Sequence, residues 1–104
     1  METRMKLNGE HWWNDQEDRS PVKRAVFDGD ELTMDASYGD VHYAINLKRI
    51  AVAFEGRAKT DNGQPDAIIR CRVYQDKNGL FAYGTWREGS TIFSYSAQLD
   101  SDEE

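Results

Sequence analysis

The chain has 104 residues, of which 38% are hydrophobic and 31% are charged, a size and balance that predict one domain with one core. Thirteen lysines and arginines stand against 19 aspartates and glutamates, and the resulting net charge of −6 disfavours binding to bulk nucleic acid or to membrane phosphate. The single cysteine excludes an intramolecular disulfide and a thiolate zinc cluster. No segment reaches the roughly 20 apolar residues of a membrane-spanning helix, and no signal peptide is expected. We therefore expect a cytoplasmic protein.

The N-terminal part of the chain is expected to hold little regular structure. Residues 1–8 are predicted to be a flexible start, and residues 9–13 form a candidate first strand. Residues 14–20 are polar or charged and precede Pro21, a composition typical of a loop. This loop would separate residues 9–13 from the strands that follow.

Three further strands are predicted at residues 22–28, 31–37 and 41–48, separated by short turns that contain glycine and aspartate. In the third of these strands the odd positions from 41 to 47 are Val, Tyr, Ile and Leu, whereas the even positions are His, Ala and Asn. This alternation indicates a strand with one buried face.

The apolar pattern changes parity after residue 49. Ile50, Val52 and Phe54 would share one face, and a corner at residues 48–49 would absorb the change. The same stretch also permits a helix at residues 48–58, because Ile50, Phe54 and Ala58 recur at helical spacing. A strand and a helix therefore both remain open for this segment.

The last part of the chain is predicted to be an antiparallel meander. Residues 67–74, 80–87 and 91–99 alternate in hydrophobicity and are joined by short turns. The acidic residues 100–104 that follow are expected to form a disordered tail.

The lengths of those turns predict which residues lie opposite each other. A turn at residues 76–79 places Arg72 opposite Tyr83. A two-residue turn at residues 88–89 places Trp86 opposite Thr91. The inner face of the three strands then holds the aliphatic residues, and Cys71 is expected there as a buried, inert thiol.

The predicted fold class is all-β, a small antiparallel meander of seven to eight strands that closes, fully or partly, into a barrel. Short connections favour a barrel, because Greek-key sandwiches need long crossovers. A two-sheet sandwich, or an α+β fold with the helix at 48–58, is the alternative. Residues 1–104 are expected to form a single domain.

The outer face of the meander combines cationic and aromatic residues in an otherwise acidic protein. Its members are Arg57, Arg70, Arg72, Tyr74, Phe81, Tyr83 and Arg87. Such pairs can simply stabilise an exposed sheet. They are also typical of protein interfaces, and aromatic platforms with arginines can bind single-stranded nucleic acid, which the net acidity disfavours.

A second candidate site lies inside the predicted barrel. Small inward residues could leave a cavity lined by Phe54, Trp86, Phe93 and Tyr95. The competing interpretation is that small and large inward residues interlock and fill the barrel.

Catalytic chemistry finds little support in the sequence. Both histidines, His11 and His42, lack a motif and are expected at the surface, and Cys71 would face the core. Carboxylates are so numerous that many pairs could be imagined as a catalytic acid and base. Their abundance therefore points to no particular pair. We expect no catalytic residue, no metal ion and no cofactor.

The sequence therefore predicts a non-enzymatic binding or regulatory module, such as an inhibitor, that contacts another protein through the outer face. A barrel that binds a small apolar ligand and a protein that binds single-stranded nucleic acid are the alternatives. A homodimer is a further option, because exposed aromatic residues could pair between two copies. No membrane partner is expected.

Overall fold

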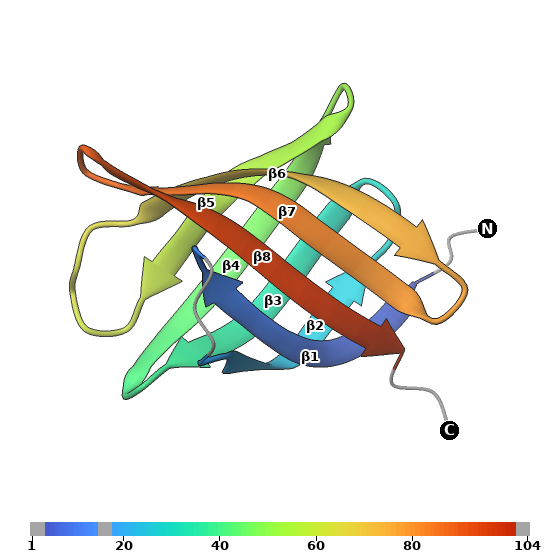
Figure 1. Cartoon of the computed structure of the whole chain (residues 1–104), viewed down its shortest axis with the longest axis horizontal. Helices are drawn as coiled ribbons and strands as arrows, with labels where there is room; N and C mark the ends of the chain where they lie inside the picture. Colours follow the sequence, from blue (N-terminus) through green and yellow to red (C-terminus); the bar gives the residue numbers. More distant parts are fainter. Residues whose placement is uncertain (1–3, 15–17, 102–104) are drawn as a thin grey trace.

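A computed structural model describes residues 4–14 and 18–101, and all its regular elements are β-strands. They follow each other as β1 (Met5–Trp13), β2 (Ser20–Phe27), β3 (Glu31–Tyr38), β4 (Val41–Ile50), β5 (Ala53–Thr60), β6 (Ala67–Asp76), β7 (Gly79–Glu88) and β8 (Thr91–Ser101). Each strand pairs antiparallel with the next, and β8 pairs with β1, which closes the barrel (Figure 1). The predicted all-β meander barrel is confirmed.

Alternation along the strands builds the core, as the sequence predicts. Tyr43, Ile45 and Leu47 of β4 are buried, and the residues between them are exposed. The interior is filled by side chains from all eight strands, with Trp86 and Tyr95 as the largest fully buried ones. Cys71 is also buried, and burial raises the pKa of its thiol to about 12.

The register between β6 and β7 follows the prediction, with Arg72 opposite Tyr83. The register between β7 and β8 differs from the prediction by two residues. Glu88 pairs with Thr91, so that Trp86 lies opposite Phe93 instead of Thr91. The turn consists of residues 89–90, where Gly89 has a positive φ of 60°. Because side chains alternate with a period of two, the slip leaves every residue on its predicted face.

The corner between β4 and β5 lies later in the chain than predicted. The turn consists of Ala51 and Val52, and no helix forms at residues 48–58. Ile50 and Val52 were expected inside, but their exposed fractions are 55% and 71%. Phe54 is buried. The two strands therefore extend to a tight hairpin whose tip carries apolar residues into solvent.

Small inward residues let the strands bend closely around the core. A Cβ atom built on Gly84 of β7 would lie 2.0 Å from the carbonyl oxygen of Arg70 on β6. Glycine in a strand commonly marks such a close approach of backbones. Ala58, Ala82 and Ala97 are also fully buried, so small residues interlock with the large aromatic ones in the middle of the barrel.

The barrel has two different ends. The turns after β2, β4 and β6 lie at one end, together with the start of β1 and the finish of β8 (Figure 1). The connections after β1, β3, β5 and β7 lie at the other end, here called the mouth. The mouth includes the longest fully described connection, residues 61–66 between β5 and β6.

The terminal strands are longer than the sequence suggested. Residues 5–8 belong to β1 instead of a flexible start, and residues 100–101 belong to β8 instead of a disordered tail. Of the predicted loop at 14–20, Asn14, Asp18 and Arg19 lie outside the strands, and Ser20 already belongs to β2. Residues 1–3, 15–17 and 102–104 lie outside the described residues. Within the described ranges, no helix has the length and apolarity needed to cross a membrane.

Candidate ligand-binding site

A cavity of about 320 Å³ opens at the mouth of the barrel. Its apolar lining comes from four aromatic residues and one valine: Trp13, Tyr38, Val41, Tyr43 and Phe93. Trp13 ends β1, and Phe93 lies near the start of β8, whereas the other three flank the β3–β4 turn. Gln64 of the β5–β6 connection and Glu88 at the end of β7 supply the polar part of the lining.

The floor of this cavity is a packed aromatic cluster. Trp13 contacts Trp86 edge to face, with ring centroids 5.1 Å apart, and Tyr43 meets Trp86 in the same way at 5.2 Å. Tyr95 lies beneath, 5.0 Å from the ring of Trp86. Such contacts hold rings more firmly than burial alone. The aromatic surface offered to a ligand is therefore built before any ligand arrives.

His11 supports the same cluster from inside the barrel. It is fully buried, which corrects the prediction of a surface histidine. Its Nε2–H donates to the carbonyl oxygen of Ser37 at 2.9 Å, and its Nδ1 accepts a hydrogen bond from the Tyr95 hydroxyl at 2.8 Å. Burial lowers the pKa of His11. A neutral imidazole that uses both nitrogens explains why a polar ring is tolerated in this core.

Glu88 is anchored at the edge of the cavity. Its Oε2 accepts a hydrogen bond of 2.7 Å from Nε1 of Trp86, whose ring is fully buried. Burial raises the pKa of Tyr43, and the negative charge of Glu88 raises it further. Tyr43 and Glu88 both line the cavity.

A second recess of about 280 Å³ adjoins the cavity and shares Tyr43, Gln64 and Glu88 with it. The β5–β6 connection forms its outer wall. This connection is held by hydrogen bonds within itself, from Thr60 Oγ1 to the Gln64 carbonyl at 3.3 Å and from the Gln64 amide to Asn62 Oδ1 at 3.2 Å.

The four residues predicted to line a pocket take three different positions. Phe93 lines the mouth cavity. Trp86 and Tyr95 lie below it in the aromatic floor. Phe54 lies near the opposite end of the barrel, beside the β4–β5 turn, where its ring centroid is 5.9 Å from that of Phe27.

Of the residues that line the cavity, the sequence predicts Phe93 and misses Trp13, Tyr38, Val41, Tyr43, Gln64 and Glu88. A signal for them exists in the meander pattern. Alternate turns of an up-and-down barrel lie at the same end, so inward residues beside the first, third, fifth and seventh connections must surround one mouth. Trp13, Tyr38 and Glu88 occupy such positions.

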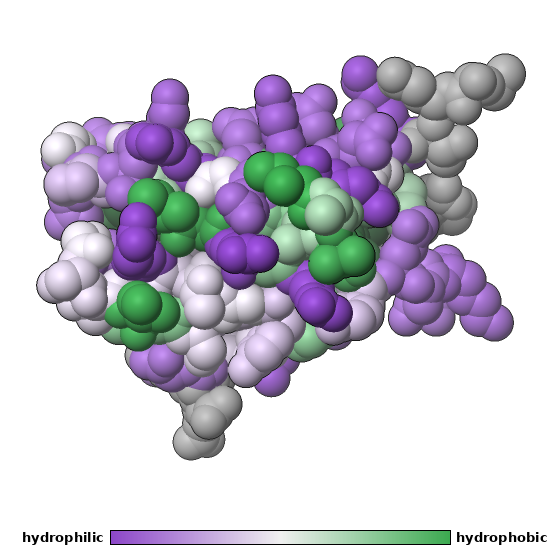
Figure 2. All heavy atoms as spheres, turned by 90° about the horizontal axis from the view of Figure 1, so that it is seen from above, coloured by the Kyte–Doolittle hydropathy of each residue, from purple (hydrophilic) through white to green (hydrophobic). Residues whose placement is uncertain are grey.

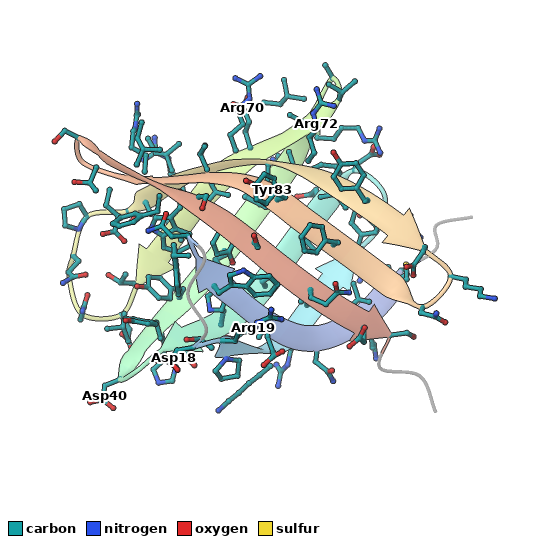
Figure 3. The ribbon with its side chains drawn as sticks, in the orientation of Figure 1. Asp18, Arg19, Asp40, Arg70, Arg72 and Tyr83 are labelled. Carbon is teal, nitrogen blue, oxygen red and sulfur yellow. The ribbon has the colours of Figure 1, made fainter. Side chains whose placement is uncertain are left out.

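The predicted outer face forms as expected from the register. Arg57, Arg70, Arg72 and Arg87 are exposed, as are Tyr74 and Tyr83. Figure 3 shows Arg70 and Arg72 projecting away from the barrel above β6, with Tyr83 on neighbouring β7.

Some residues of the outer face already contact other residues of the barrel. Arg70 forms an ion pair of 3.2 Å with Glu55, and Arg57 lies 3.9 Å from Asp66. Phe81 is half-buried and packs beside Trp12 with ring centroids 6.4 Å apart. Arg19 stacks on the same tryptophan, with its guanidinium carbon 3.9 Å from the centroid of the Trp12 ring.

Figure 2, viewed from above the β4–β5 turn, shows apolar side chains scattered among strongly hydrophilic ones. This mixed surface resembles the rim of an interface more than its dry centre. Among the described residues, no three histidine, cysteine, aspartate or glutamate side chains are grouped so that they could hold a metal ion.

Comparison with known proteins adds no family to this description. No family model matches the chain. No curated protein and no solved structure shows significant similarity to it. The candidate function therefore has to be argued from the geometry of the mouth and of the outer face.

Proposed function

We propose that the protein binds a small, largely apolar molecule in the mouth of its barrel and does not transform it. The observation that carries this proposal is the open cavity of about 320 Å³ above a preformed aromatic floor. Ligand pockets in proteins have volumes of about 300–1,000 Å³ and combine an apolar lining with a few polar groups. The mouth fits the lower part of that range, so we expect a small ligand.

A free, buried thiol suits a reducing compartment, and we include a cytoplasmic location in the proposal on this ground. The absence of a catalytic role rests on the chemistry of the mouth. His11 is buried beneath the floor with both nitrogens engaged, and Glu88 is held by Trp86.

A matched pair of tyrosine variants tests the proposal. Tyr38 lines the cavity and is 48% exposed, whereas Tyr83 lies on the outer face and is 53% exposed. Truncating either residue to alanine should therefore cost similar, small amounts of stability. We expect Tyr38→Ala to weaken binding about fivefold to tenfold, because it removes about 1 kcal/mol of aromatic contact, and Tyr83→Ala to leave binding unchanged.

The measurement is a screen of small aromatic compounds by thermal shift, followed by calorimetric titration of the hits. Binding raises the melting temperature of the native chain and of Tyr83→Ala. If Tyr38→Ala retained full affinity for every hit, the mouth would not be the binding site.

Protein binding through the outer face is a second candidate function. The observation in its favour is that Tyr83 is half-exposed directly opposite Arg72, which forms no ion pair with any described residue. Exposed tyrosine and arginine side chains are common energetic centres of interfaces. Each of the eight described strands is paired on both sides in the closed barrel, so side chains would have to supply the contact.

Replacing both Arg72 and Tyr83 by serine should abolish capture of a partner from the native host and leave the melting temperature within a few degrees. Tyr38→Ala is the matched control and should capture the partner normally. Unchanged capture by the double variant would remove this candidate. Recovery of nucleic acid instead of protein would assign the face to single-stranded nucleic acid, and self-association lost in the double variant would assign it to a homodimer.

A further inference from the structure

We infer that the ligand of the mouth is an organic cation, a protonated amine carried on an apolar ring or chain, with Glu88 as its counter-ion. This inference rests on the proposed function, since it specifies the chemical class of ligand for the same cavity.

The charge of the cavity lining favours a cation. Among the described residues that line the cavity, Glu88 is the charged one, and the others are aromatic, aliphatic or amide side chains. The adjoining recess also contains Asp66, whose carboxylate is already paired with Arg57 at 3.9 Å, so Glu88 is the carboxylate that carries the proposal. Arginines and lysines on the neighbouring strands occupy outward positions, such as Arg57 and Lys59, which flank the buried Ala58.

The Glu88 carboxylate is oriented and has one open oxygen. One oxygen, Oε2, is fixed by the Trp86 indole at 2.7 Å, which orients the group. The second oxygen, Oε1, has no hydrogen-bond or ion-pair partner within residues 4–14 and 18–101. An oriented carboxylate with one open oxygen beside a cavity lined by aromatic rings can accept a charge-assisted hydrogen bond from an ammonium group.

The aromatic rings of the lining also favour a cation. The faces of Trp, Tyr and Phe rings carry partial negative charge and attract cations that lie within about 6 Å of the ring centroid. Four such rings surround the cavity.

Anionic ligands fit the same cavity poorly. A carboxylate or phosphate would approach Glu88 without a compensating described cation in the lining. The acidic β3–β4 turn adds to this effect, since Asp40 projects at the mouth end of the barrel (Figure 3). The net charge of −6 would likewise attract cations and repel anions at long range.

The experiment compares ligands that share an apolar body and differ in charge. The probes are the phenyl and 2-naphthyl compounds that carry an aminomethyl, a hydroxymethyl or a carboxyl group. Each is titrated calorimetrically into the full chain at pH 7 and low salt. We expect the amines to bind about tenfold more tightly than the alcohols, and the acids to bind most weakly.

The variant that isolates the effect is Glu88→Gln, which removes the charge and keeps an oxygen that can accept the Trp86 hydrogen bond. It should reduce the affinity for the amines about tenfold and the affinity for the alcohols by a clearly smaller factor, because an alcohol loses only part of one hydrogen bond. Asp40→Asn is the matched control, because it removes one charge at the mouth outside the cavity lining and should change amine affinity by less than twofold. The melting temperatures of Asp40→Asn and Glu88→Gln show whether each variant keeps the fold.

The outcomes separate this inference from the function on which it rests. If the alcohols bind as tightly as the amines, or if Glu88→Gln keeps the preference for amines, the assignment of a cationic ligand is overturned and the mouth remains a ligand site. If none of the six compounds binds, both the ligand site and its charge preference are overturned.

Discussion

At the scale of single residues, His11 shows how a polar side chain is accommodated in a small barrel. Both of its nitrogens are engaged, one by the Ser37 carbonyl and one by the Tyr95 hydroxyl. Its ring also lies 4.6 Å from that of Trp13 in the floor of the cavity. In the native structure Nδ1 accepts a hydrogen bond from the Tyr95 hydroxyl. If Nδ1 were protonated, it could no longer accept this hydrogen bond. Protonation of His11 therefore opposes the native arrangement.

This geometry predicts that the protein loses stability in mildly acidic solution. Burial lowers the pKa of His11 below its ordinary value of 6.5, so the unfolded chain takes up this proton at a higher pH than the folded chain does. The free energy of unfolding is therefore highest above pH 6.5. It falls as the pH drops toward the lower folded-state pKa, by at most about 1.4 kcal/mol per pH unit.

Urea unfolding at pH 7.5 and pH 5.5 measures the effect, and His11→Gln should reduce the difference between the two values. The pKa of Asp28 is lowered by hydrogen bonds from the Asp30 and Glu31 amides. Any effect of Asp28 on the free energy of unfolding therefore changes at a lower pH than the effect of His11. The ring protons of His11 in the native protein provide an independent check by NMR. An ordinary titration of these protons near pH 6.5 would contradict the prediction.

At the scale of secondary-structure elements, the β4–β5 hairpin has an unfavourable turn. Ala51 has a positive φ of 58°, a conformation that suits glycine better than alanine. We expect Ala51→Gly to raise the free energy of unfolding by about 0.5–1 kcal/mol, because it relieves this conformation.

Val52→Gly provides the control for the hairpin. Val52 is the other residue of the turn and does not have a positive φ, so glycine there should only add freedom to the unfolded chain and lower stability. Both variants can be compared by chemical denaturation at pH 7. Stabilisation by Val52→Gly, or destabilisation by Ala51→Gly, would contradict this account of the turn.

The same hairpin explains where prediction of the elements from sequence succeeded and where it failed. Alternation identified β4 because its buried positions are all large and apolar. The turn after β4 carries no glycine, proline, asparagine or aspartate, and its apolar residues at 50–52 resembled a continuing core strand or a helix. In contrast, the Asp76 side chain accepts hydrogen bonds from the Asn78 and Gly79 amides, and this ordinary turn chemistry placed β6 and β7 in the correct register.

At the scale of the whole molecule, the outer face was easier to predict than the mouth. Local turn lengths are enough to list which residues share a face, and the face that carries Arg72 and Tyr83 formed as expected. Trp13 and Phe93 both line the mouth, although they belong to the first and the last strand of the chain. These residues meet because β1 and β8 pair to close the barrel, with Trp13 opposite Tyr95. That closing register is set by the complete sheet and by no single turn.

The position of the two terminal strands also determines where the protein can be attached to a surface or a label. The start of β1 and the finish of β8 lie together at the end away from the mouth, with Leu7 opposite Ser101 (Figure 1). A sensor surface, a fluorescent label or a second protein coupled through either terminal strand would therefore be attached at the far end of the barrel. The mouth would face the solution in every attached copy, so oriented immobilisation would leave the proposed ligand site accessible.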